Sequence, residues 1–357
     1  MEPKHPMNMH KFVKPAAIAT ATAAVVVGSV AFTLRDADAA AQQGTAKQTG
    51  QSIVFDAGLG TANDVDVLPR TGGGFAVHDE AATIKLTGAS VCSVSADKHS
   101  VLCPASITLV TLKLQDGDDK VTGTYDIDTV LQTGDGDDHV LGGPGNDQIS
   151  GGPGKDLLYG GFGEDKLEGG DGEDTLYGQA GNDVIGVKTD LKDHLWGSSG
   201  KDQLYGGETV HGDDDNDTLY PGINGDLWGG TGVDTLDFSA WTEEVNVSMD
   251  GVWNDGGDGN DTTTDPCDDW LPGGCIPGAM NAHGDLENVL GTKFGDIIIG
   301  NGAKNDFDSG EGNDAIDGRG GDDYLNVGVG QNQRVRGGEG VDTCVGFNIT
   351  TKTGCDK

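Results

Sequence analysis

The sequence predicts an all-β solenoid, in which short strands stack coil upon coil, and three observations lead to this prediction. A nine-residue pattern repeats in tandem, as in GGPGNDQIS, GGPGKDLLY and GGFGEDKLE over residues 142–168. The chain has 62 glycines among 357 residues, and only 6% of it is aromatic. Its formal net charge is −37, so a fold with so little apolar material needs counter-ions.

The acidic charge also limits the classes of partner. A strongly negative protein repels nucleic acid and anionic membranes, because both have the same sign of charge. Cations and basic surfaces are the partners that such a chain attracts. We therefore expect no nucleic-acid partner and favour a cation-binding function.

The first 39 residues have the features of a secretory signal peptide. Three lysines precede an apolar stretch over residues 15–34, and Ala37-Asp38-Ala39 supplies a small-residue cleavage motif. We expect a mature chain that begins near Ala40, is secreted and keeps no transmembrane segment after cleavage. Attachment to the cell surface stays open, as does the alternative that residues 15–34 form a membrane anchor.

Secretion would permit disulfides. The six cysteines form three sequence-local pairs, Cys92/Cys103, Cys267/Cys275 and Cys344/Cys355. Six cysteines allow fifteen connectivities, so this pairing is a hypothesis based on proximity. The absence of a CxxC motif from the sequence disfavours a metal–thiolate site.

The nonapeptide pattern GGxGxDxUx, where U is aliphatic, has a strict period. From Asp138 to Asp183, aspartates stand nine residues apart, and an aliphatic residue follows each by two positions, as Val140 follows Asp138. Upstream the pattern continues at Asp119/Val121 and Asp128/Val130, with a one-residue insertion before Asp138. Downstream it recurs at Asp193/Leu195, Asp202/Leu204, Asp217/Leu219, Asp234/Leu236, Asp296/Ile298, Asp314/Ile316, Asp323/Leu325 and Asp342/Cys344.

Each position of the pattern has a physical role. The x-U-x segment suits a short strand, whose aliphatic side chain faces inward while its neighbours face outward. The glycines permit a tight turn with positive φ, in which carbonyl groups converge. Two nonapeptides close one coil, so aspartates eighteen residues apart stack into two columns: Asp138, Asp156 and Asp174 in one, and Asp147, Asp165 and Asp183 in the other.

Stacked carboxylates need a cation. Two carboxylates ~5 Å apart repel by about 3 kcal/mol at an effective dielectric of about 20, while the buried aliphatic side chain of each repeat contributes only about 1.5–3 kcal/mol. Ca²⁺ fits best, because it accepts about six to eight oxygen ligands in flexible geometry, whereas Mg²⁺ requires a tighter octahedron. Zn²⁺ would prefer His or Cys. Binding of multiple Ca²⁺ ions and folding should then be one event.

The expected calcium ligands are the sixth-position aspartates and the backbone carbonyls of the glycine turns. The aspartates are Asp119, Asp128, Asp138, Asp147, Asp156, Asp165, Asp174, Asp183, Asp193, Asp202, Asp217, Asp234, Asp296, Asp314, Asp323 and Asp342. The carbonyls are those of Gly134, Gly136, Gly143, Gly145, Gly152, Gly154, Gly161, Gly163, Gly170 and Gly172.

Over residues 113–345 the sequence resembles the repeats-in-toxin (RTX, haemolysin-type) calcium-binding proteins. The resemblance rests on TGDGDDHVL, the three repeats above, GGDGEDTLY and GQAGNDVIG, and on the flanking segments GVDTLDFSAWTEEVNVSMDG and LENVLGTKFGDIIIGN. It implies a right-handed parallel β-roll in which each nonapeptide forms half a turn. Relatives exported by one-step machines usually have a C-terminal export signal, so an N-terminal signal is a departure.

The period divides the chain into segments. Residues 1–39 are the predicted signal peptide, 40–112 an N-terminal β-rich cap, 113–240 the RTX array, 241–292 an insertion with Cys267 and Cys275, and 293–357 the C-terminal repeats and cap. Residues 40–112 could instead form a separate binding module, and the insertion a recognition loop. Three later units deviate, because Gln333 and Gly225 replace aspartates and Asp308 is placed at an inward position, so calcium sites are doubtful there.

The sequence favours a structural or surface-interaction role over catalysis. Residues 78–83, HDEAAT, miss the HExxH metalloprotease motif, and GSSG at 197–200 is one residue short of GxSxG. A polysaccharide-acting enzyme with paired carboxylates stays open as the alternative, as does an adhesin that binds a cell-surface glycan or protein. An outward aromatic stripe, Tyr159, Tyr177 and Trp196, could stack on sugars or could only stabilise the sheet.

Overall fold

The computed structural model describes residues 43–58, 62–187, 192–222, 225–249 and 280–357. Every regular element within these ranges is a β-strand. The same part of the chain contains no helix long and apolar enough to cross a membrane. The predicted signal peptide and the pair Cys267/Cys275 lie outside the described residues.

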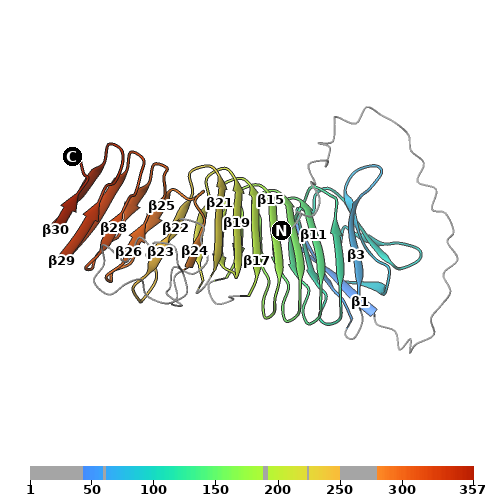
Figure 1. Ribbon diagram of the computed structural model, residues 1–357. Coiled ribbons are helices and arrows are strands. Elements are labelled where there is room, and N and C mark those ends of the chain that lie inside the picture. Colours follow the sequence, from blue (N-terminus) through green and yellow to red (C-terminus); the bar gives the residue numbers. More distant parts are fainter. Residues whose placement is uncertain (1–42, 59–61, 188–191, 223–224, 250–279) are drawn as a thin grey trace, which may run out of the picture. The chain divides into compact units, whose positions relative to one another are not determined.

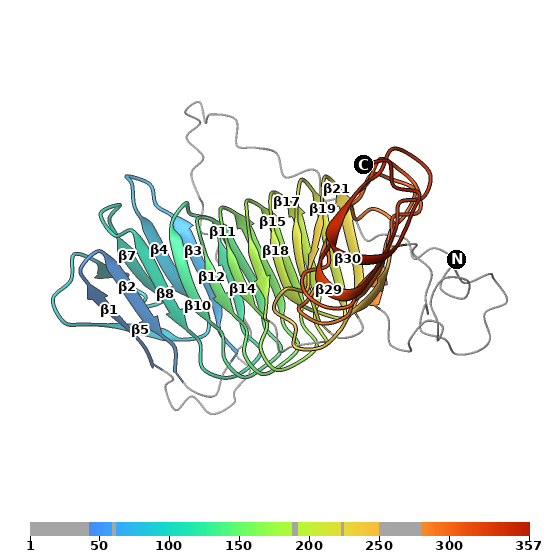
Figure 2. The ribbon, with the colours of Figure 1, turned by 90° about the vertical axis from the view of Figure 1, so that its left-hand side faces the viewer.

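Most strands belong to two stacks of parallel strands, which the turns connect into a solenoid of about 12 coils (Figures 1 and 2). In the first stack Val140 pairs with Leu158 and Leu158 with Leu176. In the second stack Ile149 pairs with Leu167. Partners are therefore eighteen residues apart, which confirms that two nonapeptides close one coil and that the fold is the predicted parallel β-roll.

The first stack contains β3 (Asp64–Pro69), β9 (Lys120–Gly123), β11 (His139–Pro144), β13 (Leu157–Phe162), β15 (Thr175–Ala180), β17 (His194–Ser199), β19 (Thr209–Asp214), β21 (Asp226–Thr231), β24 (Met280–Ala282), β23 (Asn246–Ser248), β26 (Ile297–Ile299) and β28 (Ala315–Asp317). The second contains β2 (Ser52–Asp56), β8 (Leu109–Lys113), β10 (Asp128–Gln132), β12 (Gln148–Ser150), β14 (Lys166–Glu168), β16 (Val184–Gly186), β18 (Gln203–Gly206), β20 (Thr218–Pro221), β22 (Thr235–Asp237), β25 (Asn288–Leu290) and β27 (Asp306–Asp308).

The N-terminal strands extend both stacks. β2 pairs in parallel with β8, and β3 with β9, so residues of the 40–112 segment supply the first coil. Antiparallel strands then flank these two: β1 (Gln43–Thr49) lies on β2, and β4 (Phe75–Asp79) on β3. β5 (Thr83–Thr87), β6 (Ser93–Val94) and β7 (Ser100–Cys103) complete this end, where a disulfide joins Cys92 to Cys103.

The C-terminal end consists of two long strands. β29 (Tyr324–Arg336) pairs with β27 through its first residues and with β28 through its last, and β30 (Thr343–Thr353) pairs with β29. A second disulfide joins Cys344 to Cys355. Two of the three predicted cysteine pairs are thus confirmed.

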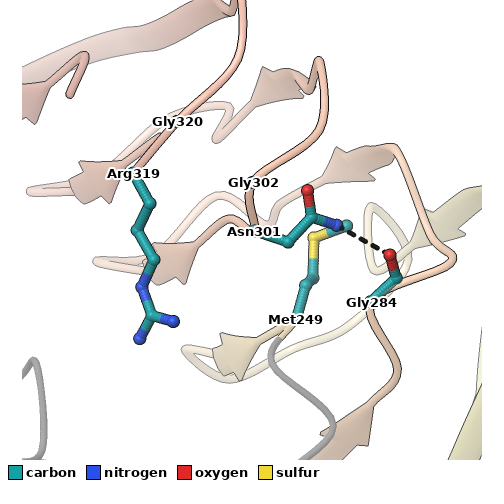
Figure 3. A pocket seen from close by; sticks show the side chains of 6 residues that line it. All are labelled: Met249, Gly284, Asn301, Gly302, Arg319 and Gly320. Atoms are coloured by element: carbon teal, nitrogen blue, oxygen red, sulfur yellow. Dashed lines mark hydrogen bonds between the residues drawn. The ribbon is translucent and has the colours of Figure 1, made fainter. Parts of the chain in front are cut away.

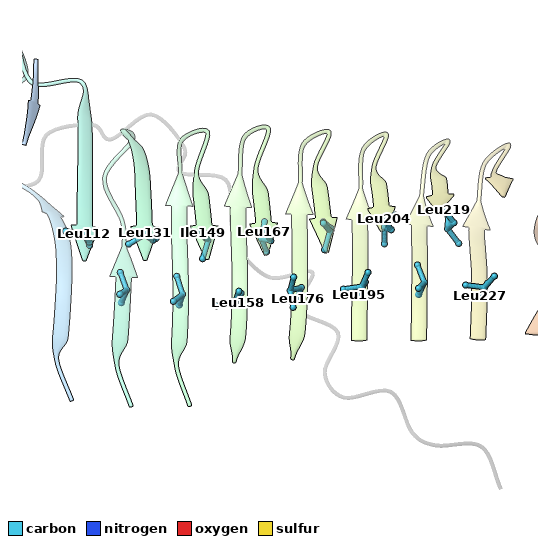
Figure 4. Close-up of a cluster of buried hydrophobic side chains, with 14 of the residues drawn as sticks. Leu112, Leu131, Ile149, Leu158, Leu167, Leu176, Leu195, Leu204, Leu219 and Leu227 are labelled. Carbon is cyan, nitrogen blue, oxygen red and sulfur yellow. The ribbon is translucent and has the colours of Figure 1, made fainter. Parts of the chain in front are cut away.

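The core consists of two rows of aliphatic side chains, to which each repeat contributes one side chain (Figure 4). Leu158, Leu176 and Leu195 come from the first stack, and Leu167 and Leu204 from the second. All five are fully buried. Because each repeat adds one inward side chain, the core is narrow, and the turns must provide much of the remaining stability.

Two register predictions are wrong. At Asp128/Val130 the chain is shifted by one residue: Leu131 is buried and pairs with Ile149, Val130 is only half-buried, and Asp128 is exposed. The one-residue insertion therefore lies before Thr129 rather than before Asp138. Asp308 is likewise exposed, because Phe307 occupies the inward position of β27 and pairs with Leu325.

The segment 241–292 contributes to the roll at both of its ends. β23 pairs with β24 and β26, and β25 pairs with β22 and β27. Residues 250–279, between β23 and β24, lie outside the described residues.

Candidate metal centre

The sixth-position aspartates form two hydrogen-bonded columns along the turn edges. In each column the Oδ1 atom of one aspartate accepts the backbone N–H of the residue one coil earlier. In the first column the N–H of Asp138 donates to Asp156 at 2.9 Å. In the second, the N–H of Asp147 donates to Asp165 at 2.7 Å, and that of Asp165 to Asp183 at 2.8 Å. The predicted columns are therefore real.

The second carboxylate oxygen, Oδ2, has a different environment. In many of these aspartates it is buried and receives no hydrogen bond from any part of the chain that the structure describes. This holds for Asp119, Asp147, Asp156, Asp165, Asp183, Asp202, Asp217, Asp234, Asp323 and Asp342, all at most 2% exposed. A buried charged oxygen without a partner is costly, so these atoms are available for a cation.

The first glycine of each repeat makes room for this oxygen. A Cβ added to Gly142 would stand 2.6 Å from Asp147 Oδ2 and 2.6 Å from the carbonyl oxygen of Gly160, which lies in the next coil. The corresponding distances at Gly151 are 2.0 Å to Asp156 Oδ2 and 2.6 Å to the Gly169 carbonyl. Only glycine fits here, and its missing side chain brings a carboxylate oxygen and a carbonyl oxygen together.

The fourth glycine lies beside the other carboxylate oxygen. A Cβ at Gly172 would stand 1.7 Å from the carbonyl oxygen of Gly154, one coil earlier, and 3.1 Å from Asp174 Oδ1. The predicted ligand Gly154 therefore lies close to the aspartate of the following coil. The second position of the repeat also requires glycine. Gly161 has a φ of 122°, and a Cβ added to it would stand 2.2 Å from the carbonyl oxygen of Gly143.

Desolvation makes the columns electrostatically unfavourable without a cation. Burial, together with the like charges of Asp138 and Asp174, raises the pKa of Asp156 to about 7. Burial also raises the pKa of Asp119, Asp165, Asp183 and Asp323 to about 7, that of Asp147, Asp202, Asp234 and Asp296 to about 6, and that of Asp217 to about 8.

This donor set fits Ca²⁺. Every candidate atom is a carboxylate or carbonyl oxygen, the ligand type that calcium prefers. Within the described ranges, no three His, Cys, Asp or Glu side chains converge on one point. A cation on the turn edge would therefore take backbone carbonyls in addition to the aspartates. The aspartates with an unpartnered Oδ2 and the neighbouring glycine carbonyls are the residues that would hold it.

Some predicted ligands have protein partners instead. Thr292 donates its N–H to Asp296 Oδ2 at 2.6 Å, and Ser309 donates its hydroxyl to Asp314 Oδ2 at 2.8 Å. Gln333 takes the aspartate's place in the column, since its Oε1 accepts the N–H of Asp314 at 2.6 Å. Asp128 does not belong to a column, because it is exposed and its Oδ1 accepts the N–H of Asn146, which is not a sixth-position residue.

Sequence reasoning missed the residues that continue the columns outside the pattern. Asn63 donates to Asp119 Oδ1 from the N-terminal segment, and Thr129 donates to Asp147 Oδ1. Glu287 accepts the N–H of Asp234 at 2.8 Å, and the buried Asn305 donates to Asp323. The eighteen-residue spacing from Asp323 back to Asn305 could have revealed the last of these.

The outward aromatic residues of the first stack form a continuous ladder, which extends the predicted stripe. Tyr159 and Tyr177 are stacked with ring centroids 4.9 Å apart, and Tyr177 and Trp196 with 4.8 Å. The ladder continues through His211, Trp228 and His283, which is hydrogen-bonded to Asp226 at 2.9 Å. The ring faces thus cover one another, and this supports the sheet-stabilising interpretation.

One surface pocket adjoins the turns that precede Asn305 and Asp323 (Figure 3). It has a volume of about 460 Å³ and is lined by Met249, Gly284, Asn301, Gly302, Arg319 and Gly320, with Asn301 donating to the Gly284 carbonyl at 3.2 Å. Its lining has no carboxylate, so it is distinct from the candidate calcium sites.

Comparison with protein families gives one match, the RTX calcium-binding nonapeptide repeat (4 copies). It covers residues 114–149, 132–167, 150–185, 192–208, 287–316 and 299–333. These ranges contain most of the column aspartates. A comparison with curated proteins found no match.

Proposed function

The chain carries RTX calcium-binding nonapeptide repeats and is a calcium-binding repeat protein, and from this premise we propose that it is secreted and folds when it meets extracellular calcium. The folded roll then serves as a structural or surface-interaction element rather than as an enzyme. The observation that supports this proposal is the row of buried, unpartnered Oδ2 atoms along both turn edges.

The coupling of folding to calcium follows from the raised pKa values. At neutral pH the unfolded chain has its carboxylates ionised and hydrated, whereas the folded chain must bury them. Each carboxylate therefore opposes folding until a cation binds. A divalent ion between coils turns the repulsion between neighbouring aspartates into attraction, so binding free energy becomes folding free energy.

Secretion is supported by the calcium demand and by the disulfides. Weak, multi-oxygen sites of extracellular type bind at roughly millimolar calcium and would stay empty in the cytoplasm. The disulfides Cys92–Cys103 and Cys344–Cys355 suit an oxidising compartment. A chain that stays unfolded before export would also remain competent for translocation. Expression of the full chain, with N-terminal sequencing of the secreted product, should give a start near Ala40.

The test of calcium-coupled folding is circular dichroism of the mature chain, residues 40–357, during calcium titration. We expect little strand signal in metal-free buffer at pH 8 and a cooperative gain as calcium rises. An equal concentration of Mg²⁺ should not reproduce the gain. A mature chain that is equally ordered and melts at the same temperature with and without calcium would contradict the proposal.

A second candidate function is adhesion through the aromatic ladder. Between β13 and β19 the outward side chains that flank the buried aliphatic residues of the first stack are Leu157, Tyr159, Thr175, Tyr177, His194, Trp196, Thr209 and His211, while the carboxylates Asp213 and Asp214 follow at the end of β19. Because the ring faces stack on one another, a glycan would meet their edges and hydroxyl groups.

Glycan-array binding tests this candidate. Tyr177→Ala combined with Trp196→Ala should abolish binding, whereas Tyr205→Ala combined with Tyr220→Ala, which removes the stacked pair on the second stack, should leave it unchanged. Binding that survives the first double substitution would rule out the ladder as the glycan surface.

A further inference from the structure

No further nonapeptide follows the repeat of Asp342 in residues 343–357. In interior coils, the next coil supplies two groups to each turn: an aspartate oxygen that accepts the N–H of the preceding aspartate, and a carbonyl oxygen beside the first glycine. At Asp323, for example, Asp342 Oδ1 accepts the N–H at 3.0 Å. A Cβ at Gly318 would stand 2.3 Å from Asp323 Oδ2 and 2.7 Å from the Gly337 carbonyl. Asp342 has no later repeat to do the same.

The C-terminal tail supplies both groups. Asp356 Oδ2 accepts the N–H of Asp342 at 3.0 Å, fourteen residues later, whereas Asp342 itself is nineteen residues after Asp323. A Cβ at Gly337 would stand 2.2 Å from the carbonyl oxygen of Gly354 and 2.4 Å from Asp342 Oδ2. Gly354 and Asp356 therefore occupy the places of the first glycine and the sixth-position aspartate of a coil that the chain does not have.

Like the interior aspartates, Asp342 has one carboxylate oxygen that accepts no hydrogen bond from the described chain. It is fully buried, and its Oδ2 receives no hydrogen bond within the described chain. This atom and the Gly354 carbonyl oxygen both lie next to the position that a Cβ of residue 337 would occupy. The end of the array thus presents the same combination of carboxylate and carbonyl oxygens that the interior turns present.

The tail is held in this position by a covalent link. Cys344 occupies the buried inward slot of the last repeat, and its disulfide partner Cys355 lies between the two replacement residues. Backbone bonds reinforce the link: the N–H of Asp356 donates to the Asp342 carbonyl at 2.9 Å. Lys352 Nζ donates to the Cys344 carbonyl at 3.0 Å.

We propose that Asp342, Asp356 and the Gly354 carbonyl form a terminal calcium site, which residues beyond the nonapeptide array complete, and that the Cys344–Cys355 disulfide holds this site together. The proposal rests on the proposed function, because it extends calcium binding to the tail. The disulfide then has a positioning role. It holds Gly354 and Asp356 beside Asp342, so that these residues together can bind a cation at the end of the roll.

Calcium stoichiometry and amide hydrogen exchange of the mature chain test the proposal. Asp356→Asn keeps an oxygen that can accept the Asp342 N–H but removes the charge, and it should lower the number of bound calcium ions by one. Glu339→Gln, which removes an exposed carboxylate near the same coil, is the matched control and should leave that number unchanged.

The disulfide is tested with Cys344→Ser combined with Cys355→Ser, against Cys92→Ser combined with Cys103→Ser at the other end. The first pair should lose one calcium ion and the calcium-dependent protection of residues 337–357, while residues 142–185 stay protected. The second pair should keep both. Unchanged stoichiometry and protection in the tail variants would refute the terminal site alone, whereas a wild-type chain that binds no calcium would refute the proposed function with it.

Discussion

Acid should replace calcium as the agent that stabilises the roll. In the folded chain, burial raises the pKa of Asp156, Asp165 and Asp183 to about 7, against an ordinary value of 3.8. Between these values the folded chain binds protons that the unfolded chain does not, so folding is favoured as pH falls. The stabilisation is complete below about pH 3.8 and is lost as pH rises through about 7. Without metal, the protein should therefore be more stable at pH 5 than at pH 8.

The magnitude follows from the same values. A carboxyl group with a folded pKa of about 7 and an unfolded pKa of 3.8 contributes roughly 2–3 kcal/mol more to folding at pH 5 than at pH 8. Several such groups together therefore give a free-energy change comparable to the whole stability of a typical domain, about 5–15 kcal/mol. Acidification of the metal-free chain should thus produce a folding transition, not a small shift in melting temperature.

The assay is circular dichroism and thermal melting in metal-depleted buffer from pH 8 to pH 5, with light scattering to detect aggregation. Asp165→Asn provides the internal check, because it removes one titrating group and should lower the stabilisation between the two pH values by roughly 2–3 kcal/mol. With calcium bound the trend should reverse, since protons compete for the ligands. A metal-free chain whose stability is constant, or falls, from pH 8 to pH 5 would refute the argument.

Three further substitutions separate the roles of the repeat positions. Asn305→Asp restores a charged sixth position, so it should lower stability without metal, raise it with calcium and add one bound ion in a stoichiometry measurement. Gly151→Ala places a Cβ 2.0 Å from Asp156 Oδ2 and should weaken calcium binding in a titration, whereas Gly302→Ala, with no atom within 4 Å of the new Cβ, should not. Leu176→Ala removes a fully buried side chain and should cost about 2–5 kcal/mol in calcium-bound denaturant unfolding, while Leu290→Ala, 38% exposed, should cost less.

The repetitive part of the fold could be predicted from the sequence, because each feature depends on residues within one or two repeats. The aliphatic residue two positions after the aspartate faces inward, as at Leu158 and Leu167, and aspartates eighteen residues apart share a column. Local spacing determines both features, since strand alternation and two strands per coil leave no other register for an uninterrupted array.

The register at the start of the array could not be predicted in this way. In the segment Asp128-Thr129-Val130-Leu131, both Asp128/Val130 and Thr129/Leu131 fit the two-residue spacing. The structure selects the second because Leu131 pairs with Leu112 of the 40–112 segment and Ile149 of the next coil. That choice depends on partners on both sides, and the nonapeptide pattern describes only one of them.

The continuation of the columns was also hidden, because its residues belong to no repeat. Asn63 and Glu287 lie more than fifty residues from their column partners. Asp356 belongs to a short tail whose pairing depends on a disulfide. Each of these residues forms a hydrogen bond with a backbone N–H or an aspartate oxygen at the end of a column. Residues in this role do not follow the nine-residue period, so the sequence pattern does not reveal them.

The two carboxylate oxygens have different tasks, and this division explains why the sixth position is usually aspartate. One oxygen accepts a backbone N–H from the previous coil, a task that the Gln333 amide oxygen also performs. If this bond were the only requirement, uncharged side chains would be better, because they avoid the cost of a buried charge. Aspartate is favoured only where the second oxygen has a cation to bind. The turns with an unpartnered Oδ2, as at Asp147 and Asp165, are therefore the ones that should hold calcium first. The turn at Asp314, where Ser309 already donates to the second oxygen, should hold it last.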